Sequence, residues 1–461
     1  MEQNLVEARR ETWSSRIGFI LAAAGSAIGL GNIWRFPYLT GQNGGAAFVF
    51  IYLSIVLLIG LPVMMAEVGL GRFTRRNPVG AFERVAPNSL WRNVGVLGVI
   101  TGFAILSYYS VVAGWTIGYT LKAATGAFAG LTDPGQTGKL FAHFVGDGRT
   151  VLTFHALFMA LTVGVVIGGL RRGIERWTLI LMPLLFLMLS LLVLRSLTLE
   201  GAGKGIAFYL QPDFSKVTAA TFLAALGQAF FSLSLGMGAM ITYGSYLSER
   251  EDAVVAAASV GLFDTIAALL AGLAIFPALF VVEGVEPTAG AGLAFVVLPA
   301  IFHRIPFGVV FGTVFFLLLA VAALTSAISL LEVCVAYLID EKGWSRKGAC
   351  FLVGMVSFLL GIPAALSIGA SDFLSSLPGI QIGFLDLMDT VFGNFALTLG
   401  GLLLCLFIGW RWARGDALAG MMQGSSYPGL GRPWLFLIRY LCPLAVGTIL
   451  LQFLIRLLLK G

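Results

Sequence analysis

Glycines interrupt an apolar stretch at residues 25–32, which read Gly-Ser-Ala-Ile-Gly-Leu-Gly-Asn. Glycine weakens helix continuity, so this stretch predicts an unwound turn with free backbone carbonyls. Carbonyls away from water are tolerated only where another group satisfies them, and a hard cation such as sodium suits oxygen ligands. The exposed N-terminus of a half-helix attracts an anionic group. One broken helix therefore offers ligands for a cation and for a carboxylate.

A second glycine pair, Gly236 and Gly238, interrupts a later apolar stretch. Five helices separate the starts of the two interrupted stretches, so the pattern predicts two five-helix repeats in opposite orientations. Taken alone, the glycines are explained equally well by helix packing, because glycine lets membrane helices approach closely.

Hydroxyl side chains lie near the second interruption and within a later span. Ser232 and Ser234 precede Gly236, and Thr325 and Ser326 lie inside an apolar stretch. A single hydroxyl of this kind usually bonds back to its own helix. The adjacent Thr-Ser pair, in a chain with two interrupted helices, favours a role in binding a cation.

Six charged residues fall within or near apolar stretches, where a charge at the bilayer centre costs about 2.5–3.5 kcal/mol. Such residues are usually functional or paired. Arg35 and Asp389 form a candidate outer pair, and Arg10 and Asp340 a candidate inner pair, although proximity to water also explains the inner two. For the two glutamates the sequence indicates no partner. The six residues are Arg35, Glu67, Asp264, Glu332, Asp386 and Asp389.

The composition places these stretches in lipid. Of the 461 residues, 58% are hydrophobic and 11% are charged, whereas a soluble domain carries about 25% charged residues. Apolar stretches of about 20 residues are membrane-spanning helices, so the predicted fold is an all-α membrane protein. Eleven spans are expected, at residues 16–38, 45–71, 94–125, 150–169, 177–196, 218–246, 254–281, 306–338, 348–366, 384–409 and 433–458.

Basic residues indicate the orientation of the spans. Most of the 29 Lys and Arg residues fall in inner loops if the N-terminus is cytoplasmic, as expected for a multi-pass protein of the inner (plasma) membrane. Eleven spans then place the C-terminus outside. The same bias explains the net charge of +6 without a nucleic-acid partner. Scattered histidines and isolated cysteines predict neither a metal site nor disulfides, and residues 1–13 lack the apolar core of a signal peptide.

The expected repeats divide the chain into four parts. Residues 1–15 form a cytoplasmic segment, 16–200 the first repeat, 201–410 the second, inverted repeat, and 411–461 a cytoplasmic loop with helix 11. The long outer loop 282–305 carries glycines among apolar residues, so it is either a lid over an outer cavity or a structural cap.

Several strings in the chain resemble one family of transporters. From about Arg10 to Asp389 the chain resembles the neurotransmitter:sodium symporters, specifically their bacterial amino-acid transporters, and the GLGNIWRFP string is the most specific match. The matching strings are GSAIGLGNIWRFPYLTGQNGGAAFVFIY (25–52), SYYSVVAGW (107–115), GQAFFSLSLGMGAMITYGSY (227–246), FDTIAALLAGLAIFP (263–277), ALTSAISLLEVCVAYLID (323–340) and FLDLMD (384–389).

The resemblance implies two sodium sites. One comprises the backbone of Ala27, the side chains of Asn32, Ser232 and Asp264, and the substrate carboxylate. The other comprises the carbonyls of Gly25, Ile28 and Ala322 and the hydroxyls of Thr325 and Ser326.

The resemblance also implies a substrate site and two gates. The substrate carboxylate meets the Leu30 and Gly31 amides and the Tyr109 hydroxyl. Ala27, Ser232 and Ser326 of the sodium sites are also expected to bind the substrate. The side-chain pocket comprises Ser26, Ile105, Phe231, Ser234, Met237, Ser329 and Leu330, with Phe231 and Tyr109 also covering the site. Arg35 with Asp389 matches the outer gate, and Arg10, Tyr246 and Asp340 match the inner gate.

Two departures from the family pattern affect these expectations. Many relatives carry Asn at the position of Asp264, and chloride-dependent members hold an anion near the positions of Tyr52, Gln228 and Ser232. A fixed carboxylate can replace that anion, so we expect chloride-independent transport. Many members also have twelve helices, and because the last helix lies outside the repeats we expect function without the twelfth.

The sequence therefore predicts a sodium-coupled symporter, not an enzyme, that imports a neutral amino acid by alternating access. The implied pocket lacks a charged side chain, and flexible Met237 suits hydrophobic or aromatic groups. We expect two sodium ions, no organic cofactor, and a monomer that suffices for transport in the bilayer. The alternative is an amino-acid-sensing receptor or a channel on the same fold.

Overall fold

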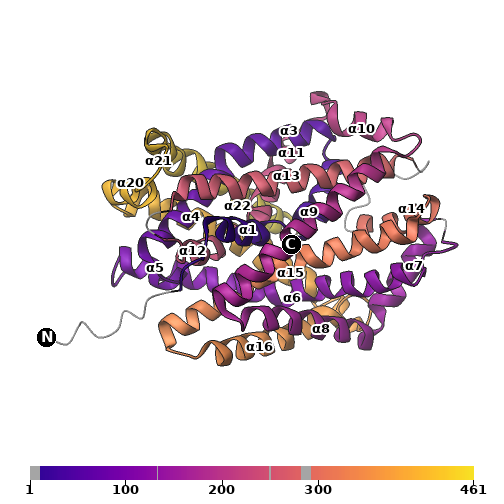
Figure 1. Cartoon of the computed structure of the whole chain (residues 1–461), viewed down its shortest axis with the longest axis horizontal. Coiled ribbons are helices and arrows are strands. Elements are labelled where there is room, and N and C mark those ends of the chain that lie inside the picture. Colours follow the sequence, from indigo (N-terminus) through magenta and orange to yellow (C-terminus); the bar gives the residue numbers. More distant parts are fainter. Residues whose placement is uncertain (1–10, 132, 249–250, 282–291, 461) are drawn as a thin grey trace.

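The computed structural model describes residues 11–131, 133–248, 251–281 and 292–460, and within these ranges it contains helices and no strand. Nine helices there are long and apolar enough to cross a membrane, or ten if one bent pair counts as a span. They run side by side along the long axis of the molecule (Figure 1). The nine cover Ala46–Thr74, Arg92–Ala124, Gly148–Val166, Leu170–Leu197, Ala253–Leu279, Gly308–Lys342, Arg346–Leu366, Phe384–Arg411 and Pro428–Ile455.

The first expected span is broken, as its glycines predict. Helix α1 ends at Ala27, and Ile28 has an extended backbone with ψ 102°. The chain resumes as a π-helical turn η1 (Gly31–Arg35) and helix α2 (Phe36–Gln42), bent by 51° from α1 (Arg16–Ala27). The last turn of α1 and the first turn of η1 therefore expose backbone groups in the middle of a span.

The sixth expected span is also broken. Helix α11 (Ala219–Ser232) and helix α12 (Ala239–Gly244) are separated by residues 233–238. Gly236 has φ 85°, and a Cβ there would lie 2.1 Å from the Leu397 carbonyl oxygen. Glycine is required at this position both by its left-handed backbone and by the close approach of the neighbouring helix.

The other spans are single helices or helices joined through π-helical turns. In chain order they are α3 (Ala46–Ile55), η2 (Val56–Gly60) and α4 (Leu61–Thr74); α6 (Arg92–Ala124); α8 (Gly148–Val166); η3 (Leu170–Glu175) and α9 (Arg176–Leu197); α13 (Ala253–Leu279); α15 (Gly308–Lys342); α16 (Arg346–Leu366); α18 (Phe384–Met388), η6 (Asp389–Ala396), α19 (Leu397–Leu406) and η7 (Phe407–Arg411); and α21 (Gly431–Phe436), η9 (Leu437–Leu441) and α22 (Cys442–Lys460).

Short helices occupy both ends of the bundle. Several lie in loops for which the sequence predicted no helix, including the outer loop 126–149, which contains α7. Of the loop 282–305, residues 282–291 lie outside the described part, and the rest forms η5 and α14. The short helices are α5 (Pro78–Val85), α7 (Pro134–Gly146), α10 (Gly203–Leu210), η4 (Phe214–Lys216), η5 (Leu293–Val297), α14 (Leu298–Arg304), α17 (Asp372–Ser375), α20 (Arg414–Met422) and η8 (Pro428–Leu430).

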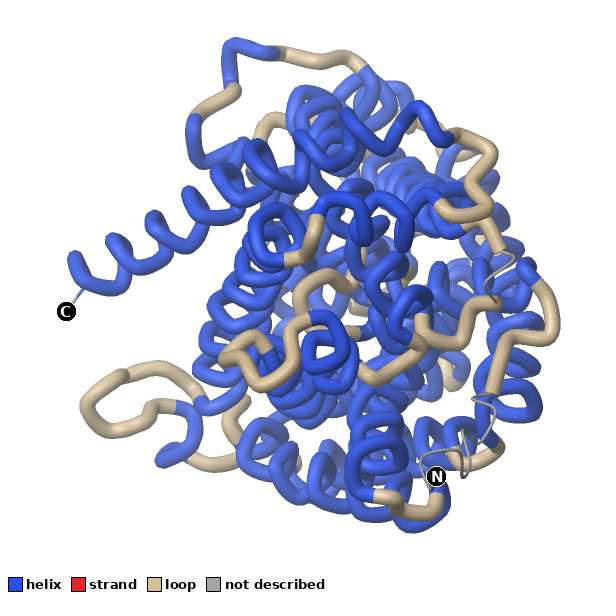
Figure 2. Tube along the Cα trace, turned by 90° about the vertical axis from the view of Figure 1, so that its left-hand side faces the viewer, coloured by secondary structure: helices blue, strands red, loops and turns tan. Residues whose placement is uncertain are grey.

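The two ends of the bundle are distinct. Helices α5, α20 and α21 lie at one end, and α7, α10 and α14 at the other (Figure 1). We call these ends the inner and the outer side, after the orientation that the basic residues predict. Seen end-on, the helices form a packed bundle, from which the last turns of the C-terminal helix extend (Figure 2).

Candidate functional site

A cavity lies where the two broken helices face α6 and α15. About 410 Å³ of space there is not occupied by atoms, including a part that is open to solvent. Its wall combines backbone and hydroxyl groups with aliphatic and aromatic side chains. The lining residues are Ser26, Ala27, Gly29, Gly31, Ile105, Tyr109, Phe231, Ser234, Met237, Ser326, Leu330 and Leu397.

Oxygen atoms from α1 and α15 converge beside this cavity. The Ser326 hydroxyl is 3.4 Å from the Gly25 carbonyl oxygen, 3.1 Å from that of Ser26 and 3.4 Å from that of Ile28. One hydroxyl hydrogen serves one of these carbonyls fully, so the cluster holds more acceptors than donors. The neighbouring Thr325 hydroxyl is 3.0 Å from the Ala322 carbonyl. A hard cation fits such a set of neutral oxygens.

A second polar cluster joins η1, α11 and α13. The Asn32 amide donates to the Asp264 carboxylate at 2.7 Å and to the Ser232 hydroxyl at 2.9 Å, while Asn32 Oδ1 accepts the Gly29 amide at 3.1 Å. The Tyr52 hydroxyl stands 3.5 Å from Asp264 Oδ2. All of these side chains are buried. The carboxylate is held by neutral donors, so its charge is available to a nearby cation.

The sequence-predicted substrate residues gather around the cavity. The Leu30 amide donates to the Tyr109 hydroxyl at 3.3 Å, which places this hydroxyl at the break. The Ser26 hydroxyl donates to Ser329 Oγ at 2.6 Å, and the Ser234 hydroxyl to the Ser26 carbonyl at 2.9 Å. The two broken helices are thus bonded to each other and to α15.

Three of the predicted substrate residues are not part of the cavity wall. Leu30, Ser232 and Ser329 are buried next to it. Conversely, Gly29 and Leu397 line the cavity and were missed. Gly29 lies inside the interrupted string, which is a sequence signal. Leu397 follows η6, and no sequence feature distinguishes it from the other apolar residues of that span.

The outer gate residues lie near the cavity but form no direct ion pair within the described ranges. The Arg35 guanidinium carbon lies 4.6 Å from the centre of the Phe231 ring. The Asp389 carboxylate accepts the Tyr108 hydroxyl at 3.0 Å and the Asn394 amide at 3.1 Å. Arg35 therefore stacks on a cavity residue, and Asp389 binds Tyr108 in place of the arginine that was predicted as its partner.

Aromatic rings pack above the cavity on the outer side. Phe295 from η5 lies at the centre of this group, 6.0 Å from the Trp34 ring and 5.9 Å from the Trp115 ring. Phe141 of α7 stacks on Phe295 at 5.5 Å. The described part of the loop 282–305 thus covers η1 and α6 with apolar contacts.

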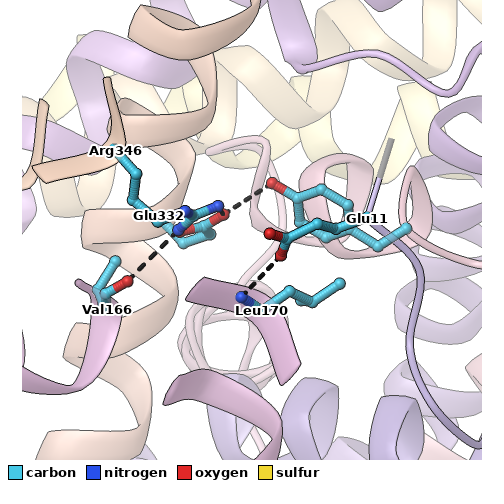
Figure 3. Close-up of polar contacts among 6 residues, drawn as sticks. Glu11, Val166, Leu170, Glu332 and Arg346 are labelled. Atoms are coloured by element: carbon cyan, nitrogen blue, oxygen red, sulfur yellow. Dashed lines mark hydrogen bonds and ion pairs between the residues drawn. The ribbon is translucent and has the colours of Figure 1, made fainter. Parts of the chain in front are cut away.

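Ionised side chains hold α15 and α16 together on the inner side. Arg346 pairs with Glu332 at 2.7 Å, and the Tyr246 hydroxyl donates to the same carboxylate at 2.7 Å. Arg346 also reaches the Val166 carbonyl at 3.4 Å. Figure 3 shows Glu11 next to this cluster. Glu332, for which the sequence indicated no partner, is thus fully paired, and Tyr246 bonds Glu332.

Residues 11–14 cover the inner side of the bundle. Glu11 accepts the Leu170 amide at 2.9 Å (Figure 3). The Ser14 hydroxyl donates to the buried Glu175 carboxylate at 2.5 Å. Trp13 donates its indole N–H to the Tyr243 carbonyl at 3.1 Å. These contacts fasten residues 11–14 across α12 and η3.

Asp340 lies on the same side. Its carboxylate accepts the Asn77 backbone amide at 3.1 Å and the Asn77 side-chain amide at 3.2 Å. The expected partner Arg10 lies outside the described residues, so the pair of Arg10 and Asp340 stays a prediction.

Glu67 also has a partner in the structure. Its carboxylate accepts the Gly236 amide at 2.7 Å, in the middle of the break between α11 and α12. The contact satisfies one of the backbone groups that the break exposes. The intramembrane carboxyl group of Glu67 therefore supports the broken helix.

The chain matches the model of the sodium:neurotransmitter symporter family over residues 10–132 and 142–459. The chain belongs to this family. It is 43% identical to the uncharacterised sodium-dependent transporter YhdH of Bacillus subtilis over 447 residues, covering 97% of this chain and 98% of the relative. It is 35% identical to an uncharacterised sodium-dependent transporter of Haemophilus influenzae over 454 residues, covering 96% and 98%.

A solved structure of this symporter family has the same fold. The crystal structure of MhsT in complex with L-phenylalanine superimposes with a TM-score of 0.87 at 46% identity, covering 96% of this chain and 99% of that chain. The resemblance drawn from the sequence strings is thus confirmed. The protein is a multi-pass membrane symporter of a sodium-dependent family, and the family is not one of enzymes.

Proposed function

We propose that this symporter imports a neutral, hydrophobic or aromatic amino acid together with sodium by alternating access. The observation that carries the proposal is the meeting of two broken helices at one cavity, with carbonyl and hydroxyl oxygens gathered around Ser326. A cation and a zwitterion satisfy the exposed backbone groups of both breaks together.

Two sodium sites fit the oxygen clusters. The first uses the Ala27 carbonyl, Asn32, Ser232 and Asp264, with the substrate carboxylate completing it. The second uses the carbonyls of Gly25, Ile28 and Ala322 and the hydroxyls of Thr325 and Ser326. Two sodium ions with a zwitterion carry two charges, each of which gains about 2.3 kcal/mol per 100 mV across the membrane.

The substrate carboxylate lies against the break in the first span. We expect the carboxylate to accept hydrogen bonds from the Leu30 and Gly31 amides, the first of which lies 3.3 Å from the Tyr109 hydroxyl. The substrate side chain extends toward Ile105, Phe231 and the remaining pocket residues. None of the residues that line the cavity in the described part is charged, which favours a neutral side chain. The phenylalanine held by MhsT supports an aromatic substrate.

Transport is chloride-independent in this proposal. Asp264 supplies a fixed negative charge within 3.0 Å of Ser232 and 3.5 Å of Tyr52. An anion is not needed where a carboxylate already offsets the sodium charge. The Asp264→Asn variant should become chloride-dependent. Absence of a chloride effect in the variant and in the original protein alike would contradict this role.

The topology proposed here has eleven spans and an inverted pair of repeats. It counts the bent pair of α1 and η1–α2 as one span and α11 with α12 as another. The N-terminus then faces the cytoplasm and the C-terminus the outside of the inner (plasma) membrane. The cavity and both clusters lie within one chain, which supports a monomer as the transporting unit.

Uptake by proteoliposomes tests the proposal. Labelled phenylalanine, tyrosine, tryptophan, leucine and alanine are supplied under an inward sodium gradient, with potassium as the control cation. We expect concentrative uptake of the larger hydrophobic amino acids in sodium only, and counterflow when unlabelled substrate is inside. Sodium-dependent binding without counterflow would instead identify a receptor, and uptake without accumulation a channel.

A further inference from the structure

The C-terminal span meets α19 at a narrow contact on the inner side. Two π-helical turns, η7 and η9, pack together there. A Cβ at Gly409 would lie 2.9 Å from the Arg439 Cα, so the two backbones are nearly in contact. The Trp410 indole N–H donates to the Arg439 carbonyl oxygen at 3.2 Å. This bond fixes the indole ring beside the arginine.

Two aromatic rings flank the Arg439 side chain. Its guanidinium carbon lies 4.1 Å from the centre of the Trp410 ring and 5.6 Å from that of Tyr440. The two rings stand at 85° to each other, 5.8 Å apart. Trp410 is 57% exposed and Tyr440 48% exposed. We call these three residues the Arg439 seam.

The Arg439 guanidinium has N–H donors that no protein acceptor in the described ranges satisfies. Within the described ranges Arg439 makes no ion pair and no side-chain hydrogen bond, and its buried Nε lacks an acceptor. A guanidinium carries five N–H donors. Its N–H groups are therefore left for acceptors from outside the protein, such as water or an anion.

The surroundings of the seam favour an anion at the lipid–water boundary. Exposed Trp and Tyr rings belong at this boundary. Arg411, Arg414 and Arg432 are exposed on the adjoining ends of η7, α20 and α21, and Asp416 is the only acidic residue between positions 407 and 441. Basic pockets between membrane helices on the cytoplasmic side suit acidic lipid headgroups.

We propose that the Arg439 seam binds the phosphate group of an anionic phospholipid. The guanidinium donates to the phosphate oxygens. The exposed ring faces contact the glycerol and the upper acyl chain, and the neighbouring arginines attract the negative headgroup. The site gives the C-terminal span, which lies outside the proposed repeats, a role as a lipid anchor. The inference depends on the chain spanning a membrane and is independent of its transported substrate.

Lipid retention measured by native mass spectrometry tests the site. Purified protein is mixed with phosphatidylglycerol or phosphatidylcholine of identical acyl chains. The original protein should retain phosphatidylglycerol preferentially, and Arg439→Gln should reduce that retention about fivefold, as expected for one arginine at a charged surface. Arg439→Lys keeps the charge but loses the planar fork, so it should give an intermediate value.

Arg172→Gln is the matched control. Arg172 is exposed on η3, also on the inner side, and removing it changes the net charge equally. The control should retain phosphatidylglycerol as the original protein does. Equal loss in both variants, or equal retention of the two lipids by the original protein, would overturn the proposal. If Arg439→Gln fails to fold, two comparisons still test the proposal: the retention of the two lipids by the original protein, and the retention of phosphatidylglycerol by Arg439→Lys and by the original protein.

Inorganic phosphate distinguishes a lipid site from a simple anion site. Phosphate in millimolar excess should leave phosphatidylglycerol in place, because the acyl chain and the rings contribute to its binding. Complete displacement by inorganic phosphate would contradict a lipid site.

Discussion

The two sides of the central cavity are closed by different kinds of contact. On the inner side a buried carboxylate, Glu332, is held by Arg346 and by the Tyr246 hydroxyl. On the outer side Phe295 packs among aromatic rings, and Arg35 lies on Phe231 with no direct bond to Asp389 in the described structure. Charged contacts depend on every partner, because loss of one leaves a buried charge. Aromatic contacts weaken gradually as rings separate.

This difference indicates that the contacts on the inner side break in a single step. The inner side is held by a few charged groups. These groups are stable either when they are paired with one another or when they are separated and hydrated. The outer side depends on many ring contacts that can loosen one at a time. Under the alternating access proposed above, we expect the inner side to stay closed until substrate and sodium are bound.

The largest effect is expected from Arg346→Gln. It leaves the Glu332 carboxylate buried with only the Tyr246 hydroxyl, and breaking a buried pair in this way costs about 3–5 kcal/mol. The thermal unfolding midpoint in detergent should fall clearly, and the double variant with Glu332→Gln should recover most of the loss. Lys347→Gln, an exposed neighbour, serves as the control. Equal midpoints for Arg346→Gln and Lys347→Gln would remove the basis of the comparison.

A smaller effect is expected from Ser326→Ala, which tests the cavity between the two sides. The variant loses a hydroxyl beside the Gly25 and Ile28 carbonyls. Hydrogen bonds and ligands to charged groups contribute about 1.5–3 kcal/mol, so the sodium concentration for half-maximal uptake should rise about tenfold or more. Ser259→Ala is the control, because its hydroxyl bonds back to the Val255 carbonyl of the same helix. Similar sodium dependence in both variants would argue against a cation at Ser326.

The smallest effect is expected from Phe295→Leu on the outer side. The substitution keeps an apolar side chain but loses the ring geometry of Phe295. Each ring pair contributes about 0.5–1.5 kcal/mol beyond the area that it buries, and contributions of neighbouring contacts do not add. The contacting rings are Trp34, Trp115, Tyr119, Phe141 and Phe316. Bound amino acid should dissociate a few-fold faster, with little change in the unfolding midpoint. Phe373→Leu, at a residue 64% exposed, is the control. A loss of stability as large as that of Arg346→Gln would show that the outer contacts do not loosen more gradually than the inner ones.

The sequence allowed the broken helices to be predicted because their cause is local. Glycines at Gly29, Gly31, Gly236 and Gly238 weaken a helix wherever it packs, and the structure ends α1 and α11 close to them. The clustering of hydroxyls near the breaks followed from the same strings. The short helices of the loops were missed because most of them are too short to show a helical period, and their stability comes from tertiary packing.

Pairing between distant side chains could not be predicted in the same way. Glu332 and Arg346 lie on consecutive helices, and only the packing of α15 against α16 brings them together. Tyr108 took the position at Asp389 that charge alone suggested for Arg35. Leu397 reaches the cavity because the close approach at Gly236 brings its span there. In each case helix packing determines which residues meet. That packing depends on residues far apart in the sequence, so a local pattern does not reveal it.

Equilibrium binding of labelled phenylalanine to the purified protein tests the central claim most directly. Sodium is varied at constant ionic strength with potassium as the replacement. Two broken helices that hold a cation and a zwitterion together predict that affinity for phenylalanine rises with sodium and that affinity for sodium rises equally with phenylalanine. Phenylalanine binding of the same affinity in sodium and in potassium would contradict the account.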